Sequence, residues 1–230
     1  MSLKTFAASM TLGLLISGSS FMAIAQENAA TPGVMGEPAA HECVTDLGTA
    51  EVPENAKGFV ISSEESQAQF TVTEELAGQG LNDAVGTTNA IIGTLLVDNE
   101  GNPLPCSRID VDIRTLQTDE SRRDARMLSA LNVNEYPVAT FIVTEISGIE
   151  GPLEEGTETN LILVGNLTIS GVEHQVSWDA TVTLQDGVVK GSASTMIRFD
   201  DYGVSKPVMG PVMSIEDEVY LTIDIVASSN

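Results

Sequence analysis

The sequence predicts an all-β protein that closes as an antiparallel eight-stranded β-barrel, with one short helix after its third strand. Apolar and polar residues alternate in successive runs from Gly58 onward, which is the period of strands with one buried face. Glycine, asparagine and aspartate separate these runs at hairpin spacing. An up-and-down barrel is favoured because it pairs every strand edge, and a β-sandwich is the alternative.

The N-terminus predicts a cleaved signal peptide. Lys4 precedes an apolar run, and Ala23-Ile24-Ala25 fits the small-x-small rule for cleavage after Ala25. A membrane-spanning anchor is the alternative, but a span needs about 20 mostly apolar residues, and four consecutive small residues, 17–20, dilute this run. We therefore expect a periplasmic or secreted protein without stable membrane insertion.

Composition divides the rest of the chain into two parts. Residues 26–57 are rich in Ala, Glu, Pro, Gly and Thr and have no apolar period, so they predict a flexible leader. The predicted domains are therefore a signal peptide at 1–25, the leader at 26–57 and a barrel at 58–228.

The run from Cys106 to Leu116 gives the clearest strand pattern. Its apolar residues alternate with charged ones, so one face of the strand is apolar and the other is fully charged. The other predicted strands lie around 68–72, 85–97, 138–149, 161–169, 175–184, 188–199 and 219–225.

The predicted helix lies between Asp119 and Tyr136. Asp119 or Ser121 is the expected N-cap, and Glu120 and Asp124 favour the positive end of the helix. Helix is excluded at Tyr136 because a residue before proline is pushed to extended geometry. Pro137 thus leads directly into the next strand.

Two cysteines, Cys43 and Cys106, lie in a chain expected in an oxidising compartment. An intrachain disulfide between them would attach the leader to a strand entrance, while a free thiol or an interchain bridge stays open. His41 near Cys43 supplies too few ligands for zinc, so no metal is expected.

The charge is strongly acidic. The full chain has a net charge of −23, which becomes −24 once Lys4 is removed with the signal peptide. This acidity argues against nucleic acid and anionic membrane surfaces, which recruit basic patches. It indicates solubility or a saline habitat, and a lipid would be bound as one extracted molecule.

An eight-stranded barrel is either just filled by side chains or able to hold one small ligand. Most of the expected inner residues are medium-sized and few are aromatic, which favours a tunnel for a long hydrocarbon over a packed core. The predicted lipid-binding residues are Phe70, Val72, Ile109, Val111, Ile113, Met127, Phe141, Val143, Leu167, Trp178, Ala180 and Leu221.

A polar head group is expected near the helix, where Arg122, Arg123 and Arg126 gather. Arg123, Asp124 and Arg126 are the predicted head-group residues, since guanidinium groups meet phosphates or hydroxyls. Ion pairs with the acidic residues 119, 120 and 124 are the alternative, and it stays open.

Enzyme chemistry is not expected. His41 lies in the leader, His174 starts a strand, and no Gly-x-Ser-x-Gly elbow is present. The charged residues alternate toward the outer face, so no cofactor or catalytic group is predicted. The alternative to a lipid carrier is a structural or stress-protective barrel filled by its own side chains.

Several short motifs resemble, in their order, the YceI-like family of secreted bacterial proteins over about Gly58–Ala227. They are Glu65-Ser66-x-Ala68-x-Phe70, Arg123-Asp124, Tyr136-Pro137-x-Ala139-Thr140-Phe141, Gly165-x-Leu167-Thr168-Ile169-x-Gly171-Val172, Asp201-Tyr202-Gly203-Val204 and Glu218-Val219-x-Leu221.

The resemblance implies a lipocalin-like barrel that binds a polyisoprenoid or a similar long-chain amphiphile outside the cytoplasm, with the helix flanking the pocket. The expected partner is a single lipid, whether isoprenoid, quinone-like or fatty amide or acid, and a homodimer is left open. This chain departs from the family at Glu65, where many members have histidine, and in a slightly shorter stretch between Asp124 and Tyr136.

Overall fold

The computed structural model describes residues 43–208 and 210–229. The predicted signal peptide and the leader up to residue 42 lie outside the described residues. The strands are β1 (Thr45–Asp46), β2 (Thr49–Ala50), β3 (Ala56–Ile61), β4 (Gln67–Leu76), β5 (Gly80–Thr88), β6 (Ile91–Asp98), β7 (Arg108–Asp112), β8 (Val138–Ser147), β9 (Glu158–Ile169), β10 (Val172–Gln185), β11 (Val188–Arg198) and β12 (Val212–Ser229). The helices are η1 (Ile113–Thr115), α1 (Ser121–Ala130) and η2 (Asp200–Tyr202). In this part of the chain no helix is both long and apolar enough to span a membrane.

The main sheet closes into the predicted eight-stranded antiparallel barrel. Its strand order is β11-β10-β9-β8-β7-β6-β3-β12-β4-β5, and β11 also pairs with β12. β3 and β4 both pair with β12, at Ala227↔Ile61 and Ile223↔Ala68. They therefore lie one after the other along the same strand position of the barrel. β5 and β6 share the next position, because they pair with β4 and β3 respectively.

The interruptions in these two long strands lie side by side. The Ser66 hydroxyl accepts a hydrogen bond from Val226 N at 3.0 Å, and Asn89 Nδ2 donates to Ser66 O at 2.8 Å. The single run predicted at 85–97 is therefore two strands, since the chain leaves the ladder at Asn89 and Ala90. Glu65, which departs from the family pattern, is exposed at this interruption.

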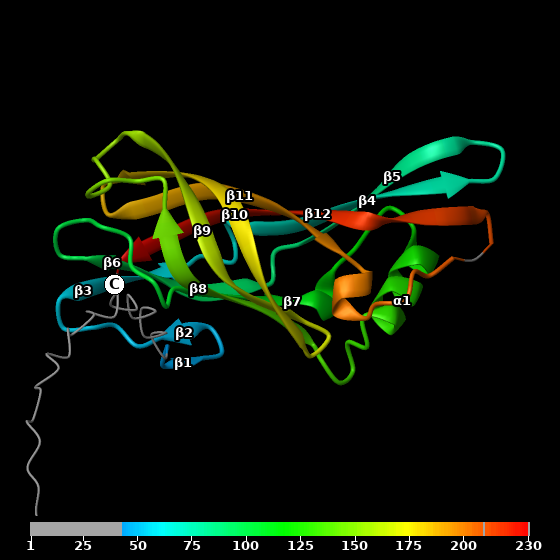
Figure 1. Ribbon diagram of the computed structural model, residues 1–230, viewed down its shortest axis with the longest axis horizontal. Helices are drawn as coiled ribbons and strands as arrows, with labels where there is room; N and C mark the ends of the chain where they lie inside the picture. The colour runs from blue at the N-terminus through cyan, green and yellow to red at the C-terminus, as the bar shows by residue number, and fades with distance from the viewer. Residues whose placement is uncertain (1–42, 209, 230) are drawn as a thin grey trace, which may run out of the picture. The chain divides into compact units, whose positions relative to one another are not determined.

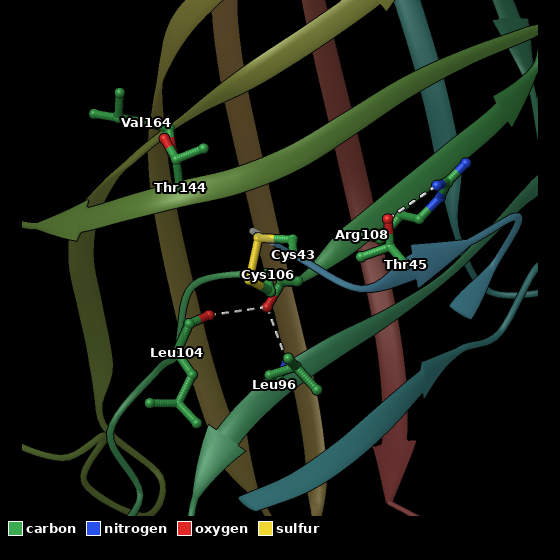
Figure 2. The surroundings of a disulfide bond; sticks show 9 residues. Cys43, Thr45, Leu96, Leu104, Cys106, Arg108, Thr144 and Val164 are labelled. Atoms are coloured by element: carbon green, nitrogen blue, oxygen red, sulfur yellow. Dashed lines mark hydrogen bonds between the residues drawn. A yellow bond between two sulfur atoms is a disulfide. The ribbon is translucent and has the colours of Figure 1, made fainter. Parts of the chain in front are cut away.

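The N-terminal hairpin β1–β2 lies on the outer face of the barrel. The disulfide between Cys43 and Cys106 has a Cα–Cα distance of 5.2 Å and joins the start of this hairpin to the loop before β7 (Figure 2). From Cys43 on, the segment predicted as a leader thus includes paired strands. The hairpin's Gly48 N donates to Asp110 Oδ2 at 2.6 Å, and Arg108 donates to Thr45 at 3.1 Å.

This hairpin changes the environment of the charged face of β7. Asp110 was expected to be exposed, but its side chain is fully buried. Arg108 Nε lies 2.6 Å from Asp110 Oδ2, and the Thr140 hydroxyl donates to Oδ1 at 2.6 Å. The carboxylate is therefore paired and hydrogen-bonded, as a buried charge must be.

α1, the one α-helix among the described residues, follows β7 and lies with η2 at one end of the barrel, beside the projecting hairpin β4–β5 (Figure 1). Its N-cap is Glu120, whose side chain accepts from Arg122 N, so the expectation of Asp119 or Ser121 is wrong. Asp124 lies in the first turn of the helix, as expected, and also accepts hydrogen bonds from the backbone N and the hydroxyl of Thr118, which holds the loop before the helix. Asn132, with φ 50°, ends the helical turn.

Candidate functional site

The barrel encloses an apolar cavity of about 140 Å³ beneath α1 and η2. Its wall comes from opposite sides of the barrel and from both helices. The inward-facing residues that line it are Ala68, Phe70, Ile109, Val111, Ile113, Leu116, Met127, Leu131, Ala139, Phe141, Leu167, Ile169, Trp178, Ile197, Phe199, Tyr202, Val204, Val219, Leu221 and Ile223.

Two smaller cavities adjoin the main one. A cavity of about 60 Å³ shares Ile109, Phe141, Trp178 and Ile223 with it and continues toward Val189. A second, of about 40 Å³, shares with it Met127 of α1 and the residues that flank η2, Phe199 and Val204, and reaches the projecting strands. Each of the two smaller voids thus shares lining side chains with the main cavity.

Two aromatic rings lie flat against the barrel wall over glycines. A Cβ at Gly86 would lie 2.1 Å from Phe70 Cε1, and a Cβ at Gly165 would lie 2.7 Å from Phe141 Cε2. The absence of side chains at these glycines lets the two rings pack on the neighbouring backbone, and both rings still line the main cavity.

The structure brings most of the predicted lipid-binding residues to these voids. Those on the main cavity are Phe70, Ile109, Val111, Ile113, Met127, Phe141, Leu167, Trp178 and Leu221. Val72 lines the cavity of about 40 Å³ and Ala180 the cavity of about 60 Å³. Val143 is 1% exposed in the core and lines none of the three cavities.

The predicted head-group residues have different environments. Arg123 Nη2 lies 2.8 Å from Glu74 Oε1, and Nη1 contacts Asp119. Asp124 holds Thr118, as described above. Within residues 43–208 and 210–229, the guanidinium groups of Arg122 and Arg126 make no ion pair. Arg123 therefore forms ion pairs, which was the alternative to head-group binding. Its partner Glu74 was not among the acidic residues that the sequence suggested.

The Glu74–Arg123 pair fastens α1 to β4. The Glu74 side chain is 3% exposed and also accepts from Asn82 Nδ2 at 3.2 Å. Burial lowers the pKa of Arg123, but its hydrogen bonds to Asp119 and Glu74 outweigh this effect and leave the pKa raised. Arg123 therefore stays charged, and both of its terminal nitrogens already contact carboxylates.

Two residues that line the main cavity have a buried polar atom without a hydrogen-bond partner among the described residues: Trp178 Nε1 and the Tyr202 hydroxyl. The two side chains are 2% and 3% exposed. Burial, with a smaller contribution from the charge of Asp201, raises the pKa of Tyr202 to about 12. Tyr202 is thus a neutral hydrogen-bond donor at physiological pH.

Sequence reasoning did not assign several residues of the upper wall to the site. They are Leu131 at the end of α1, Tyr202 in η2, and Phe199 and Val204 on either side of η2. The Asp201-Tyr202-Gly203-Val204 motif was the available signal, but no alternation places such a loop against a cavity. Among the described residues, no three His, Cys, Asp or Glu side chains gather as metal ligands.

An up-and-down barrel with an apolar, segmented interior and a helix beside its mouth defines a class of small-ligand-binding β-barrels. The chain belongs to the YceI-like domain family, which matches residues 59–227. It is 28% identical over 148 residues to the UPF0312 protein Ent638_1570 of Enterobacter sp. (strain 638), covering 61% of this chain and 71% of that protein. The UPF0312 protein YE1254 of Yersinia enterocolitica is 26% identical over 148 residues, covering 60% of this chain and 71% of that protein.

Solved structures share the fold at low sequence identity. A polyisoprenoid-binding domain from Saccharophagus degradans aligns with a TM-score of 0.59 and 13% identity, over 75% of this chain and 98% of that domain. BcnA of Burkholderia cenocepacia aligns with a TM-score of 0.58 and 17% identity, over 73% of this chain and 99% of BcnA. These likenesses show the fold of the barrel.

Proposed function

We propose that this protein binds and carries one long-chain isoprenoid or similar amphipathic lipid inside its barrel, outside the cytoplasm. The observation that most directly supports this proposal is the apolar cavity of about 140 Å³, which adjoins two smaller voids. Family membership supports the proposal, as does the description of the Saccharophagus degradans neighbour as a polyisoprenoid-binding domain. The predicted signal peptide and the disulfide support an extracytoplasmic location.

The size of the voids sets how such a lipid enters. An apolar cavity of roughly 150 Å³ takes one benzene molecule, so the main cavity matches about one isoprene unit. A longer chain therefore displaces the partitions between voids. Phe141 and Trp178, whose ring centroids lie 5.6 Å apart, line both the main cavity and the cavity of about 60 Å³, and so lie between them.

The energetics favour a hydrocarbon chain. Burying ten methylenes contributes roughly 8 kcal/mol at about 0.8 kcal/mol each. Association and the ordering of the chain offset a substantial part of this gain. The remainder supports micromolar binding without any strong polar contact.

The direct test is native mass spectrometry and lipid extraction of the full chain produced in a bacterial host with its own N-terminus. A bound lipid of one chain length class is expected. Ala68→Phe fills the main cavity and should abolish co-purification, whereas Ala125→Phe on the exposed face of α1 should not. A chain that never carries lipid and takes none on titration would support the alternative of a structural, self-filled barrel.

A further inference from the structure

The projecting hairpin has an open strand edge. β5 is the last strand in the order of the main sheet and pairs with β4 along its whole length, from Ala68↔Thr88 to Leu76↔Gly80 (Figure 1). The strand position beyond β5 belongs to β7, which pairs with β6 on this side and ends at Asp112. From there the chain turns into η1 and α1, so no strand of the described chain lies against the other edge of β5.

The loop before α1 shows which backbone groups this edge presents. Thr87 N donates to Gln117 O at 2.9 Å, and Gln117 N donates to Thr87 O at 3.0 Å, so Thr87 turns its backbone groups away from β4. Successive residues of an antiparallel strand alternate in this respect, and the register between β4 and β5 has no shift. Val85, Asp83 and Leu81 therefore turn their N–H and C=O groups the same way. These groups have no hydrogen-bond partner among residues 43–208 and 210–229.

The side chains of these three residues are exposed. Leu81 is 75% exposed and Val85 is 41% exposed, and Asp83 between them is exposed as well. Asp83 accepts a hydrogen bond from the Thr73 hydroxyl at 2.8 Å, and a second exposed carboxylate, Glu75, lies opposite Leu81 on β4. Neither carboxylate forms an ion pair within the part of the chain that the structure describes. The edge thus presents apolar, acidic and apolar side chains in turn.

A second copy of this chain fits the edge poorly. Two-fold pairing centred on Asp83 brings Leu81 opposite Val85, but it also brings Asp83 opposite its own copy. Like charges directly opposite each other on neighbouring strands are destabilising. Moving the centre by one residue brings the open residues against Gln79 or Thr87, whose N–H groups already donate within this chain. The net charge of −23 adds to the repulsion between copies.

The charge of the edge favours a basic partner instead. An open strand edge is a template for pairing with another chain, and an extended peptide can add a strand to it through main-chain hydrogen bonds. A cationic side chain opposite Asp83 would meet a carboxylate that has no ion pair, with Glu75 diagonally behind it. The positions opposite Leu81 and Val85 favour apolar side chains, because both residues are exposed apolar surface.

We propose that the edge of β5 at Leu81, Asp83 and Val85 is a docking site for an extended segment of another protein. The segment adds an antiparallel strand to the sheet and carries a basic residue opposite Asp83, between two apolar residues. It lies beyond Gln117, next to the loop before α1. This interaction goes beyond lipid binding and does not depend on it.

The test measures hydrogen exchange of backbone amides in the full chain. Without a partner, the amides of Leu81, Asp83 and Val85 should exchange fast because no described residue bonds to them. The probe is the peptide acetyl-Thr-Val-Thr-Lys-Thr-Val-Thr-amide, which places its valines opposite Leu81 and Val85 and its lysine opposite Asp83. Peptide that occupies nine-tenths of the sites should slow the exchange of these three amides about tenfold.

Two modified peptides separate strand addition from general attraction. N-methylation of the lysine amide, which faces the edge, removes one main-chain hydrogen bond and should weaken binding at least about fivefold. N-methylation of the threonine that follows the lysine is the matched control, because this amide faces away from β5. Replacing the lysine by glutamate should also weaken binding, because it places two carboxylates opposite each other.

Two protein variants test the charge at the edge. Asp83→Lys should reverse the preference, so that the glutamate peptide binds more tightly than the lysine peptide. Asp179→Lys, at an exposed residue on the outer face of β10, changes the net charge by the same amount and should keep the preference for lysine.

Three outcomes would overturn the inference. The first is no protection of the three amides by the lysine peptide at millimolar concentration, and the second is equal binding of the lysine and glutamate peptides. The third is protection that appears with rising protein concentration alone, together with a dimer in analytical ultracentrifugation, which would make a second copy the occupant. None of these outcomes bears on lipid binding in the barrel.

Discussion

Replacing Arg123 by methionine should destabilise the protein strongly, because it leaves the Glu74 carboxylate buried with only Asn82 as a partner. Breaking a buried ion pair costs about 3–5 kcal/mol. Arg123 is 21% exposed, so we expect the lower end of that range, about 3 kcal/mol. A domain of this kind has a total stability of roughly 5–15 kcal/mol, and the loss should be plain in urea unfolding followed by far-ultraviolet circular dichroism.

The controls distinguish a structural arginine from a free one. Arg122→Met, on an exposed helical residue without an ion pair in the described chain, should change the free energy of unfolding by less than about 0.5 kcal/mol. The double variant Arg123→Met with Glu74→Leu removes both charges and should recover most of the loss. If Arg123→Met is as mild as Arg122→Met, the pair does not fasten α1, and Arg123 is again a candidate for binding a head group.

Three further predictions concern the cavity wall, the disulfide and the alkaline limit of stability. Gly86→Ala should push the Phe70 ring into the main cavity and weaken lipid binding, and Phe70→Leu in the same chain should restore it; titration by fluorescence checks both. Replacing Cys43 and Cys106 by serine should lower the free energy of unfolding by about 4 kcal/mol by the chain-entropy estimate for a separation of 63 residues, and an unchanged urea midpoint would contradict this. The pKa of Tyr202 rises from 10.0 to about 12 on folding, so its contribution to the free energy of unfolding is complete below pH 10 and is lost toward pH 12. The free energy of unfolding should fall by about 3 kcal/mol over that range. Tyr202→Phe should flatten the pH profile of urea unfolding in the same range.

Alternation predicted the barrel well because it reports which face of each strand is buried. Ile109 and Val111 point inward as their period requires, and the helix follows β7, the strand predicted at Cys106–Leu116. The same pattern misassigned Asp110, since alternation identifies the second face of a strand but not a distant segment that covers it. Only the pairing of Cys43 with Cys106 indicated that the N-terminal segment lies near β7.

The partners of polar groups were the least predictable part of the site. Glu74 lies 49 residues from Arg123 in the chain, and its place on an alternating strand does not show that α1 crosses above it. At the split of the run at 85–97, the Asn89 side chain donates a hydrogen bond to the backbone oxygen of Ser66, which lies between β3 and β4. Such contacts follow from how the barrel closes, and the local sequence does not contain that information.

Two glycines, Gly86 and Gly165, make room for aromatic rings in the wall of the barrel cavity. A barrel of this size has only enough interior for side chains or one small ligand, so the orientation of a few aromatic rings decides between the two. Phe70 and Phe141 pack against Gly86 and Gly165, where a Cβ would overlap their rings, and both rings line the main cavity. Trp178 is tilted by 51° to Phe141, and both rings line the main cavity and the cavity of about 60 Å³. A lipid chain that extends from one of these voids into the other would therefore have to displace Phe141 or Trp178.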